Sequence, residues 1–214
     1  MTLRDISVAA REGTPEWPGD SPFVCRWTWA MAAGASVNVS AIHTSPHVGT
    51  HADAPLHVRE GAAGADRLPL DAFVGRCVVV SVDASADDVG PPALESRLGG
   101  ARTERVLLRT GATIAAGAFP ARWPALTADA ARWLVARGVR LVGVDAPSVD
   151  RRESTTLAVH HALFDGGAYV LENLDLRAVA DGEYVLIAPP LKVGPLDAAP
   201  VRALLADDDP TAGR

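Results

Sequence analysis

The apolar and polar residues of this chain alternate, or form short apolar runs, at intervals that predict β-strands more often than helices. Trp27, Trp29 and Met31 stand at alternate positions, which predicts a strand. Continuous apolar runs are typical of strands buried on both faces. The strands predicted in this way are residues 27–31, 36–42, 76–82, 105–110, 139–145, 168–174 and 183–189.

One segment has the pattern of a helix. Residues 127–138 begin with Thr127, which can cap a helix, carry Asp129 in the first turn and end at Arg137-Gly138. The strand predicted at 139–145 follows directly, which indicates a crossover onto a central sheet. Residues 11–23 contain three Pro and two Gly, which predict an ordered loop.

These elements predict a single α/β domain with mixed β-sheets, few helices and long loops. The chain has 214 residues, of which 48% are hydrophobic, enough for one sizeable core. We assign residues 1–205 to this domain. We expect the acidic segment 206–214 to fray, because it lacks large apolar side chains.

The amino-acid composition excludes some classes of partner and indicates a cellular compartment. The net charge is −6 and the basic residues are scattered, which argues against a nucleic-acid partner. No apolar run approaches the roughly 18 residues of a membrane span, and residues 1–10 lack the pattern of a signal peptide. Cys25 and Cys77 have neither metal-binding nor redox spacing, so we expect free thiols and a cytoplasmic protein.

The densest chemistry lies in residues 45–57. His47, His51, Asp53 and His57 fall within eleven residues, and the whole chain has only six histidines. Neutral imidazole and carboxylate are ligands of Zn²⁺ and similar ions, and a metal site with a free position can be hydrolytic. Four such groups in one short segment predict a functional metal site. Coincidence or a purely structural metal is the alternative.

The spacing of these four groups constrains their backbone. They are separated by 4, 2 and 4 positions, so an extended segment would place them on one face, opposite mainly small or apolar residues. A helix would divide them between two sides about 120° apart, and Pro55 would break it. A straight strand would hold His47 and His51 about 13 Å apart. We therefore predict a bent path, which Gly49 and Pro55 permit.

A second group of candidate ligands comes late in the chain. His160 and Glu172 flank the turn signal Asp165-Gly-Gly167, and a chain reversal there can bring them together. Glu172 lies among apolar residues, where a carboxylate is costly unless it is paired or binds a cation. The alternative is an outward-facing Glu172 with His160 at a helix end, and the spacing does not decide between the two. The even spacing of His43 from His47 would allow a ligand role, but we interpret His43 as an ordinary residue at a strand end.

Together the two groups supply six side chains, which exceeds what one tetrahedral ion with an open position needs. The six are His47, His51, Asp53, His57, His160 and Glu172. They suit a two-metal site with a spare base, in which Asp53 and Glu172 can bridge. No thiolate takes part, which allows Zn²⁺ or Mn²⁺ and disfavours a closed structural zinc site.

Residues 47–57, His-Val-Gly-Thr-His-Ala-Asp-Ala-Pro-Leu-His, resemble the signature HxGTHxDxPxH of the metal-dependent cyclase family. Within that family the chain is most similar to the bacterial kynurenine formamidases, or arylformamidases. The likeness extends over most of the chain. The flanking segments that carry it are 5–7, 14–20, 34–40, 106–110, 138–145, 160–161 and 188–201.

The resemblance implies a swivelling β/β/α-type fold, a homodimer and two Zn²⁺ per subunit. It implies that His47, His51 and Asp53 hold one zinc, and that Asp53, His160 and Glu172 serve the second, with both carboxylates shared. His57 matches the catalytic proton shuttle. Trp17 matches an aromatic residue of the substrate pocket, although from the sequence alone a loop tryptophan packed on prolines is the simpler interpretation.

The activity implied is metal-dependent hydrolysis of N-formyl-L-kynurenine to L-kynurenine and formate, a step of tryptophan degradation. No Gly-x-Ser-x-Gly motif occurs, which argues against a serine hydrolase. The alternatives are another amide hydrolase of the family, such as an isatin hydrolase, and a non-catalytic zinc-stabilised binding module. Two features depart from the family pattern: Asn173 stands where many relatives have a small residue such as Gly, and the segment 165–168 is less basic.

Overall fold

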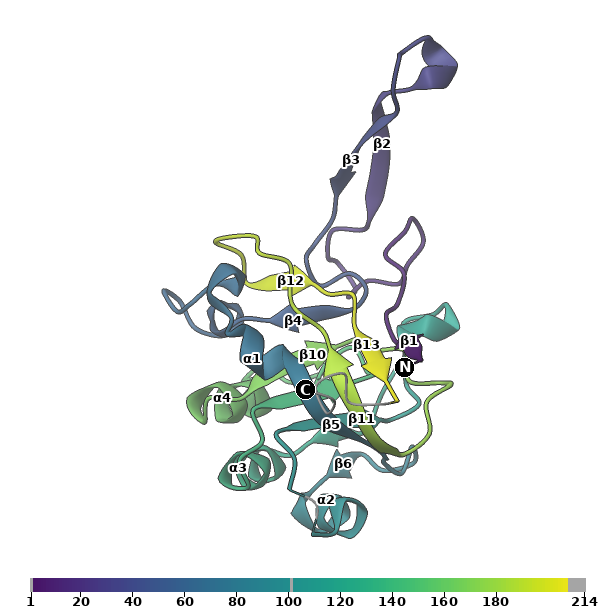
Figure 1. The fold of residues 1–214 in the computed structure, drawn as a ribbon. Coiled ribbons are helices and arrows are strands. Elements are labelled where there is room, and N and C mark those ends of the chain that lie inside the picture. Colours follow the sequence, from purple (N-terminus) through teal and green to yellow (C-terminus); the bar gives the residue numbers. More distant parts are fainter. Residues whose placement is uncertain (1, 101, 208–214) are drawn as a thin grey trace.

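The fold was obtained as a computed structural model, which describes residues 2–100 and 102–207 (Figure 1). The strands are β1 (Leu3–Asp5), β2 (Val24–Trp29), β3 (Val39–His43), β4 (His51–Asp53), β5 (Val74–Ser81), β6 (Asp88–Val89), β7 (Arg105–Arg109), β8 (Ala125–Leu126), β9 (Leu141–Val144), β10 (Tyr169–Glu172), β11 (Gly182–Ile187), β12 (Ala198–Pro200) and β13 (Leu204–Ala206). The helices are α1 (Leu70–Phe73), α2 (Pro91–Leu98), α3 (Ala128–Ala136) and α4 (Ala158–Asp165). Four 3₁₀ turns are η1 (Met31–Ala33), η2 (Pro55–His57), η3 (Ala65–Arg67) and η4 (Ile114–Ala116).

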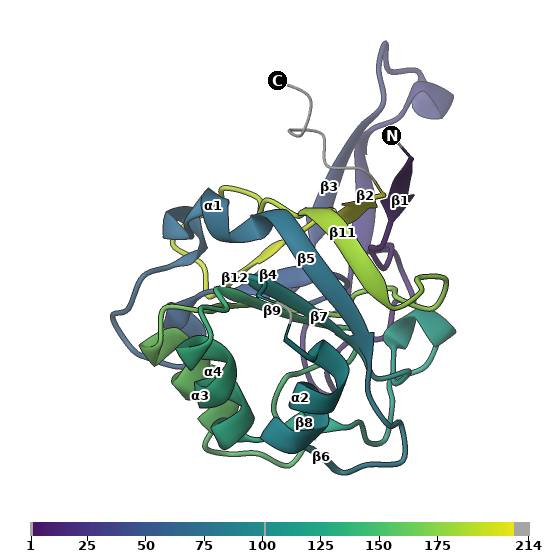
Figure 2. The same cartoon turned by 60° about the horizontal axis from the view of Figure 1, so that its bottom comes forward.

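A curled nine-stranded sheet organises the molecule, in the order β1-β13-β11-β5-β7-β9-β10-β4-β12. Its centre, from β5 to β10, is parallel, and its flanks are antiparallel. β7 and β9 are parallel neighbours, so the chain crosses over between them through α3, as predicted. Helices α2, α3 and α4 pack together below this sheet in Figure 2.

The central strands are buried on both faces, because successive side chains point to opposite sides. On β7, Leu107 belongs to one apolar cluster, whereas Val106 and Leu108 belong to the other, which the helices cover. Gly143 on β9 allows close packing at this point: a Cβ there would lie 2.5 Å from Leu107 Cδ2. The predicted α/β class, with a mixed sheet and few helices, is confirmed.

The element predictions hold with shifted ends. All seven predicted strands are present, but Met31 lies in the 3₁₀ turn η1 rather than in β2, because the chain turns at the hairpin tip. The predicted helix is α3, and Thr127 caps it by accepting the N–H of Ala130 at 3.1 Å. Residues 11–23 form a loop, as expected.

The C-terminal segment departs from prediction at its start. Ala206 is fully buried and pairs with Leu3 in the sheet, so β13 continues into the segment that we expected to fray. Asp207 accepts a hydrogen bond from Arg4 at 2.9 Å. The rest of that prediction concerns residues 208–214, which lie outside the described residues.

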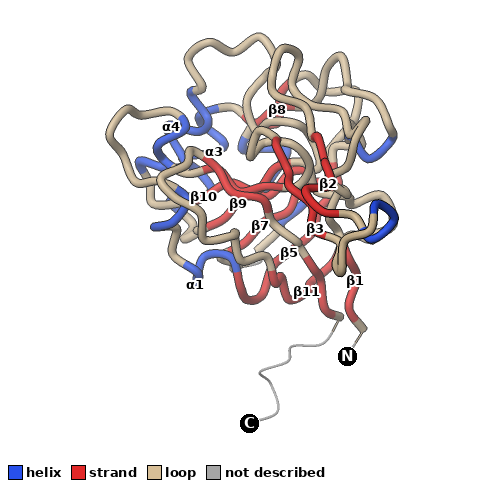
Figure 3. Tube along the Cα trace, turned by 90° about the horizontal axis from the view of Figure 1, so that it is seen from above, coloured by secondary structure: helices blue, strands red, loops and turns tan. Residues whose placement is uncertain are grey.

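The hairpin formed by β2 and β3 projects from the body (Figure 1). Seen from above, it lies on the side of the molecule opposite α3 and α4 (Figure 3). The loop 11–23, which contains Trp17, leads into β2, and β3 leads into the histidine-rich segment 45–57. Both strands of the hairpin are therefore directly connected to candidate site residues. Among the described residues, no helix has the length and apolar character needed to cross a bilayer.

Candidate metal centre and active site

Strand pairing brings the two predicted groups of ligands together. β4 and β10 are antiparallel neighbours, with His51 directly opposite Glu172. Ala52, between His51 and Asp53, points into an apolar core, so the two ligand-type side chains point to the other face. Helix α4 lies beyond that face and supplies His160.

The segment that carries the early histidines is bent, as predicted. Gly49 has a φ of 76°, which favours glycine, and a Cβ there would lie 3.2 Å from the carbonyl oxygen of Val8. After the short strand β4, Pro55 begins the 3₁₀ turn η2, which ends at His57. The two bends return His47 and His57 towards β4.

Asp53 lies at the centre of the cluster and is fully buried. Its Oδ1 is 3.2 Å from His47 Nδ1 and 3.3 Å from His51 Nε2. Its Oδ2 is 3.1 Å from His160 Nε2. One carboxylate therefore contacts three imidazoles from two distant parts of the chain.

Glu172 is the second carboxylate of the cluster. Its Oε2 is 3.6 Å from His51 Nε2, and its Oε1 is 3.4 Å from His160 Nε2 and accepts the N–H of Val149 at 2.8 Å. Glu172 is 4% exposed and His160 is 1% exposed. The alternative of an outward-facing Glu172 is therefore wrong.

Two further carboxylates, which sequence reasoning missed, hold the imidazoles in place. Asp150 Oδ2 is 2.7 Å from His160 Nδ1, and the same carboxylate accepts the N–H groups of Val159 and His160 at the start of α4. Asp197 Oδ2 is 2.9 Å from His47 Nε2 and 3.3 Å from His57 Nδ1. Carboxylates that fix the second nitrogen of a histidine are common behind metal ligands.

The charges of the cluster depend on one another. Burial lowers the pKa of His47, but hydrogen bonds to Asp197 and Asp53 outweigh it and raise the pKa to about 10. Burial likewise opposes the rise at His51, whose pKa the charge of Asp53 raises to about 9. Burial raises the pKa of Asp53, but the surrounding imidazoles hold it well below its usual range. Carboxylates and imidazolium groups therefore stabilise each other when no cation is bound.

The donor set fits a divalent cation. His51, Asp53 and Glu172 each offer a ligand atom within 4.8 Å of the others, and so do His47, Asp53 and His57. Asp53 Oδ1 is buried and makes no well-formed hydrogen bond, although two imidazole nitrogens lie close to it. Such a convergence of N and O ligand atoms around a buried oxygen is the arrangement that a cation satisfies.

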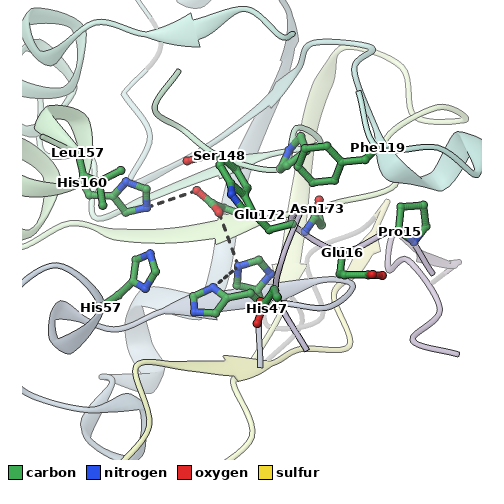
Figure 4. Close-up of a pocket in the computed structure, with 14 residues that line it drawn as sticks. Pro15, Glu16, His47, His57, Phe119, Ser148, Leu157, His160, Glu172 and Asn173 are labelled. Atoms are coloured by element: carbon green, nitrogen blue, oxygen red, sulfur yellow. Dashed lines mark hydrogen bonds and ion pairs between the residues drawn. The ribbon is translucent and has the colours of Figure 1, made fainter. Parts of the chain in front are cut away.

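A cavity of about 300 Å³ opens onto this cluster. Figure 4 shows His57 and His160 on one side of it, Glu16 and Asn173 on the other, and Phe119 above the cluster. Trp17 also lines the cavity and packs edge-on against Phe119 and Trp123, with ring centroids 5.5 and 5.9 Å away. The cavity thus joins a polar floor to an aromatic wall.

The remaining histidines lie outside this arrangement or at its edge. The His57 side chain is 29% exposed and lines the cavity, with its ring centroid 4.5 Å from that of His47. His43 is exposed at the end of β3, in agreement with its interpretation as a strand-end residue. His161 does not line the cavity.

Comparisons with known proteins show the family to which the chain belongs. The Cyclase family model matches residues 4–151. A kynurenine formamidase of Salinibacter ruber is 45% identical, over 97% of this chain and 98% of that protein. A solved structure described as a potential metal-dependent hydrolase with cyclase activity is 31% identical and has a TM-score of 0.84, covering 98% of this chain and 99% of its own. Isatin hydrolase A from Labrenzia aggregata is 26% identical with a TM-score of 0.81, covering 97% and 94%.

The fold and these matches define an α/β protein of the metal-dependent hydrolase class, and the chain belongs to the Cyclase family. Within that family, the predicted resemblance to the kynurenine formamidases is confirmed by the Salinibacter ruber protein.

Protonation of the cluster should make metal binding strongly pH-dependent. His47 and His51 have pKa values raised to about 10 and about 9, and each must lose its proton to become a ligand. Below pH 9, we expect the apparent metal affinity to rise roughly tenfold per pH unit for each such imidazole. Zn²⁺ titrations between pH 6 and 8 measure this, and an affinity that stays constant over the range would contradict it.

Whereas metal affinity should rise with pH, the thermal stability of the metal-free protein should fall. A histidine pKa raised above 6.5 contributes stability that is complete below pH 6.5 and is lost as the pH rises through about 9 to 10. The melting temperature of chelator-treated protein should therefore fall between pH 6.5 and about pH 9 to 10, whereas the increase in melting temperature on adding metal should become larger.

Proposed function

We propose that this protein hydrolyses N-formyl-L-kynurenine to L-kynurenine and formate, as a zinc-dependent arylformamidase. The observation that carries the proposal is the joint presence of the buried histidine–carboxylate cluster below an aromatic-walled cavity and of end-to-end similarity to a kynurenine formamidase. The class of substrate is a small aryl amide, which a cavity of about 300 Å³ accommodates.

The cluster would hold two Zn²⁺, with Mn²⁺ as the alternative ion. His47, His51 and Asp53 would serve one ion, and His160 and Glu172 would serve the other together with Asp53. The support for this division is that Asp53 directs one oxygen to the first pair of imidazoles and the other to His160. When bound, such ions lower the pKa of a coordinated water and polarise a carbonyl group.

His57 would move a proton to the departing aryl amine. It lines the cavity beside the cluster, and its Nδ1 lies 3.3 Å from Asp197, which can orient the ring. An imidazole suits this work because it can both accept and donate a proton, and general acid–base catalysis contributes typically about 10²–10⁴-fold. Trp17 and Phe119 would pack against the aryl ring of the substrate.

Two substitutions separate the role of His57 from that of the ligands. His57→Ala should retain bound metal and lose about 10²–10⁴-fold in kcat, because only proton transfer is removed. His51→Ala should lose metal and activity together, because a buried ligand is removed. Metal content and steady-state kinetics on the same preparations measure both effects. A His57→Ala enzyme with nearly full activity would show that His57 is not the proton shuttle.

The second candidate is an isatin hydrolase, which the Labrenzia aggregata structure favours through its similar fold. We expect the metal-loaded protein to hydrolyse N-formyl-L-kynurenine with a kcat/KM at least about tenfold above that for isatin, because its sequence is more similar to a kynurenine formamidase. Steady-state assays of both amides test this. Faster turnover of isatin would reverse the assignment, and a metal-loaded protein inactive on both would indicate a binding module.

We also propose that two copies form a homodimer through the β2–β3 hairpin. Its exposed apolar side chains include Trp27 and Trp29, which are 64% and 59% exposed. The others are Met31, Val37, Val39 and Ile42. Together these side chains expose on the order of 500 Å² of apolar surface, comparable to the largest apolar patches of monomeric proteins, which are often functional. A two-stranded hairpin standing alone is only marginally stable.

A second copy is the occupant that we favour, because the body of the same chain also carries exposed apolar side chains. Leu70, Val74, Leu191 and Leu196 are 40–61% exposed. These residues come from α1, the start of β5 and the connection between β11 and β12. The three segments are in contact, because Val74 pairs with Ile187 and the N–H of Ala188 donates to the carbonyl of Phe73. Between residues 24 and 43 only Arg26 carries a formal charge, so the hairpin suits an apolar interface. Reciprocal docking of hairpin on body would form a closed twofold dimer.

The dimer can be tested by light scattering coupled to size exclusion. The parent chain should have a mass of about twice 22.3 kDa, and the double variant Trp27→Ser/Trp29→Ser should shift towards the monomer. Thr28→Ala, between the two tryptophans, is the matched control, because it changes β2 at the same place without removing a large apolar side chain, and it should remain dimeric. A parent chain that elutes as a monomer at micromolar concentration would contradict the proposal.

The cytoplasm is the compartment that we propose. Cys25 is exposed and Cys77 is buried, and neither forms a disulfide. Free thiols of this kind are typical of a reducing environment.

A further inference from the structure

Asn173 follows Glu172 at the point where β10 ends, and its backbone is held in an unusual conformation. Its φ is 57°, in the left-handed region that Asn tolerates better than most residues. Its N–H donates to the carbonyl of Ala146 at 3.0 Å, and its own carbonyl accepts the Thr50 hydroxyl at 2.5 Å. The main chain is therefore fixed on both sides, and the side chain stands on a rigid support.

The side-chain amide of Asn173 has no hydrogen-bond partner among the described residues. The residue is only 5% exposed, and Oδ1 is enclosed by protein atoms without a donor near it. Nδ2 is not enclosed in this way, and Asn173 lines the cavity (Figure 4). The enclosed Oδ1 cannot reach a bound molecule, whereas Nδ2 is a donor that has no acceptor among the described residues, so a molecule in the cavity can supply one.

Only one other side-chain atom in the described part of the chain is buried and unpaired, namely Asp53 Oδ1. A cation explains that atom, because Asp53 is charged and lies among imidazoles. The unpaired Nδ2 of Asn173 is a hydrogen-bond donor and calls for an acceptor. Figure 4 places Asn173 between Glu172 and Glu16, and both of these carboxylates can only accept hydrogen bonds when ionised. The amide of Asn173 adds a donor to this side of the cavity.

We propose that Asn173 is a substrate-recognition residue whose Nδ2 donates a hydrogen bond to a carbonyl oxygen of the bound aryl amide. This inference rests on the proposed function. Two carbonyl groups of N-formyl-L-kynurenine offer the required acceptor: the formyl group that is cleaved and the ketone attached to the ring.

The test compares two substrates and two variants. N-Formyl-L-kynurenine has both carbonyl groups, whereas formanilide has only the formyl group. Asn173→Gly removes the amide and is compatible with the positive φ. Asn173→Asp keeps the size and tolerates the same φ, but its ionised side chain cannot donate. Thermal stability and bound metal are measured on every preparation, and kinetics are compared at equal metal content.

Both variants should lose about 10- to 100-fold in kcat/KM on N-formyl-L-kynurenine. An equal loss on formanilide, mainly in kcat, would assign the hydrogen bond to the formyl oxygen. A loss confined to N-formyl-L-kynurenine, mainly in KM, would assign it to the ketone. Parent-like kinetics of either folded, metal-loaded variant on both substrates would overturn the proposal.

The same assays separate this inference from the function on which it rests. If the metal-loaded parent protein hydrolyses neither formamide, the proposed function fails. If the parent is active and the Asn173 variants match it, the formamidase assignment stands and only the role of Asn173 is wrong.

Discussion

The structure depends on the burial of two carboxylates, Asp53 and Glu172, on the same face of a sheet. Removing an ionised carboxylate from water is very costly unless positive charge and hydrogen bonds compensate it. Here His47, His51 and His160 supply the compensation, as imidazolium groups or as ligands of cations. Burying any one of these five side chains alone in charged form would be costly, whereas burying them together is not, because opposite charges compensate each other. The position of each side chain in the site therefore depends on the others.

The fold supplies the rest of the site by holding these groups where they need one another. Antiparallel pairing of β4 with β10 joins the two halves of the ligand set, and α4 closes it from the helical layer. Asp150 has a double role, because it both satisfies the first N–H groups of α4 and orients His160. Asp197, just before the edge strand β12, holds His47 and His57 together. The site therefore includes, besides the predicted ligands, two carboxylates that orient the histidines, Asp150 and Asp197.

Much of this could be predicted from local patterns. Residues 47–57 concentrate ligand-type side chains at even spacing, and Gly49 and Pro55 indicate the bend that gathers them. Asp150 and Asp197 carried no such signal, since isolated aspartates in loops are common and their partners are set by tertiary packing. The pairing of His51 with Glu172 is likewise non-local, so the spacing left it open. Ala206 lies in a strand only because Leu3, at the other end of the chain, pairs with it.

Anomalous diffraction from crystals of the zinc-loaded protein tests the central claim most directly, because it locates the ions themselves. The account predicts two peaks on either side of Asp53, one beside His51 and the other beside His160 and Glu172, with ligand distances of about 2.0–2.2 Å. Absence of ions from this cluster, with Asp53 contacted only by imidazolium groups, would contradict it. Ions bound elsewhere on the chain would contradict it equally.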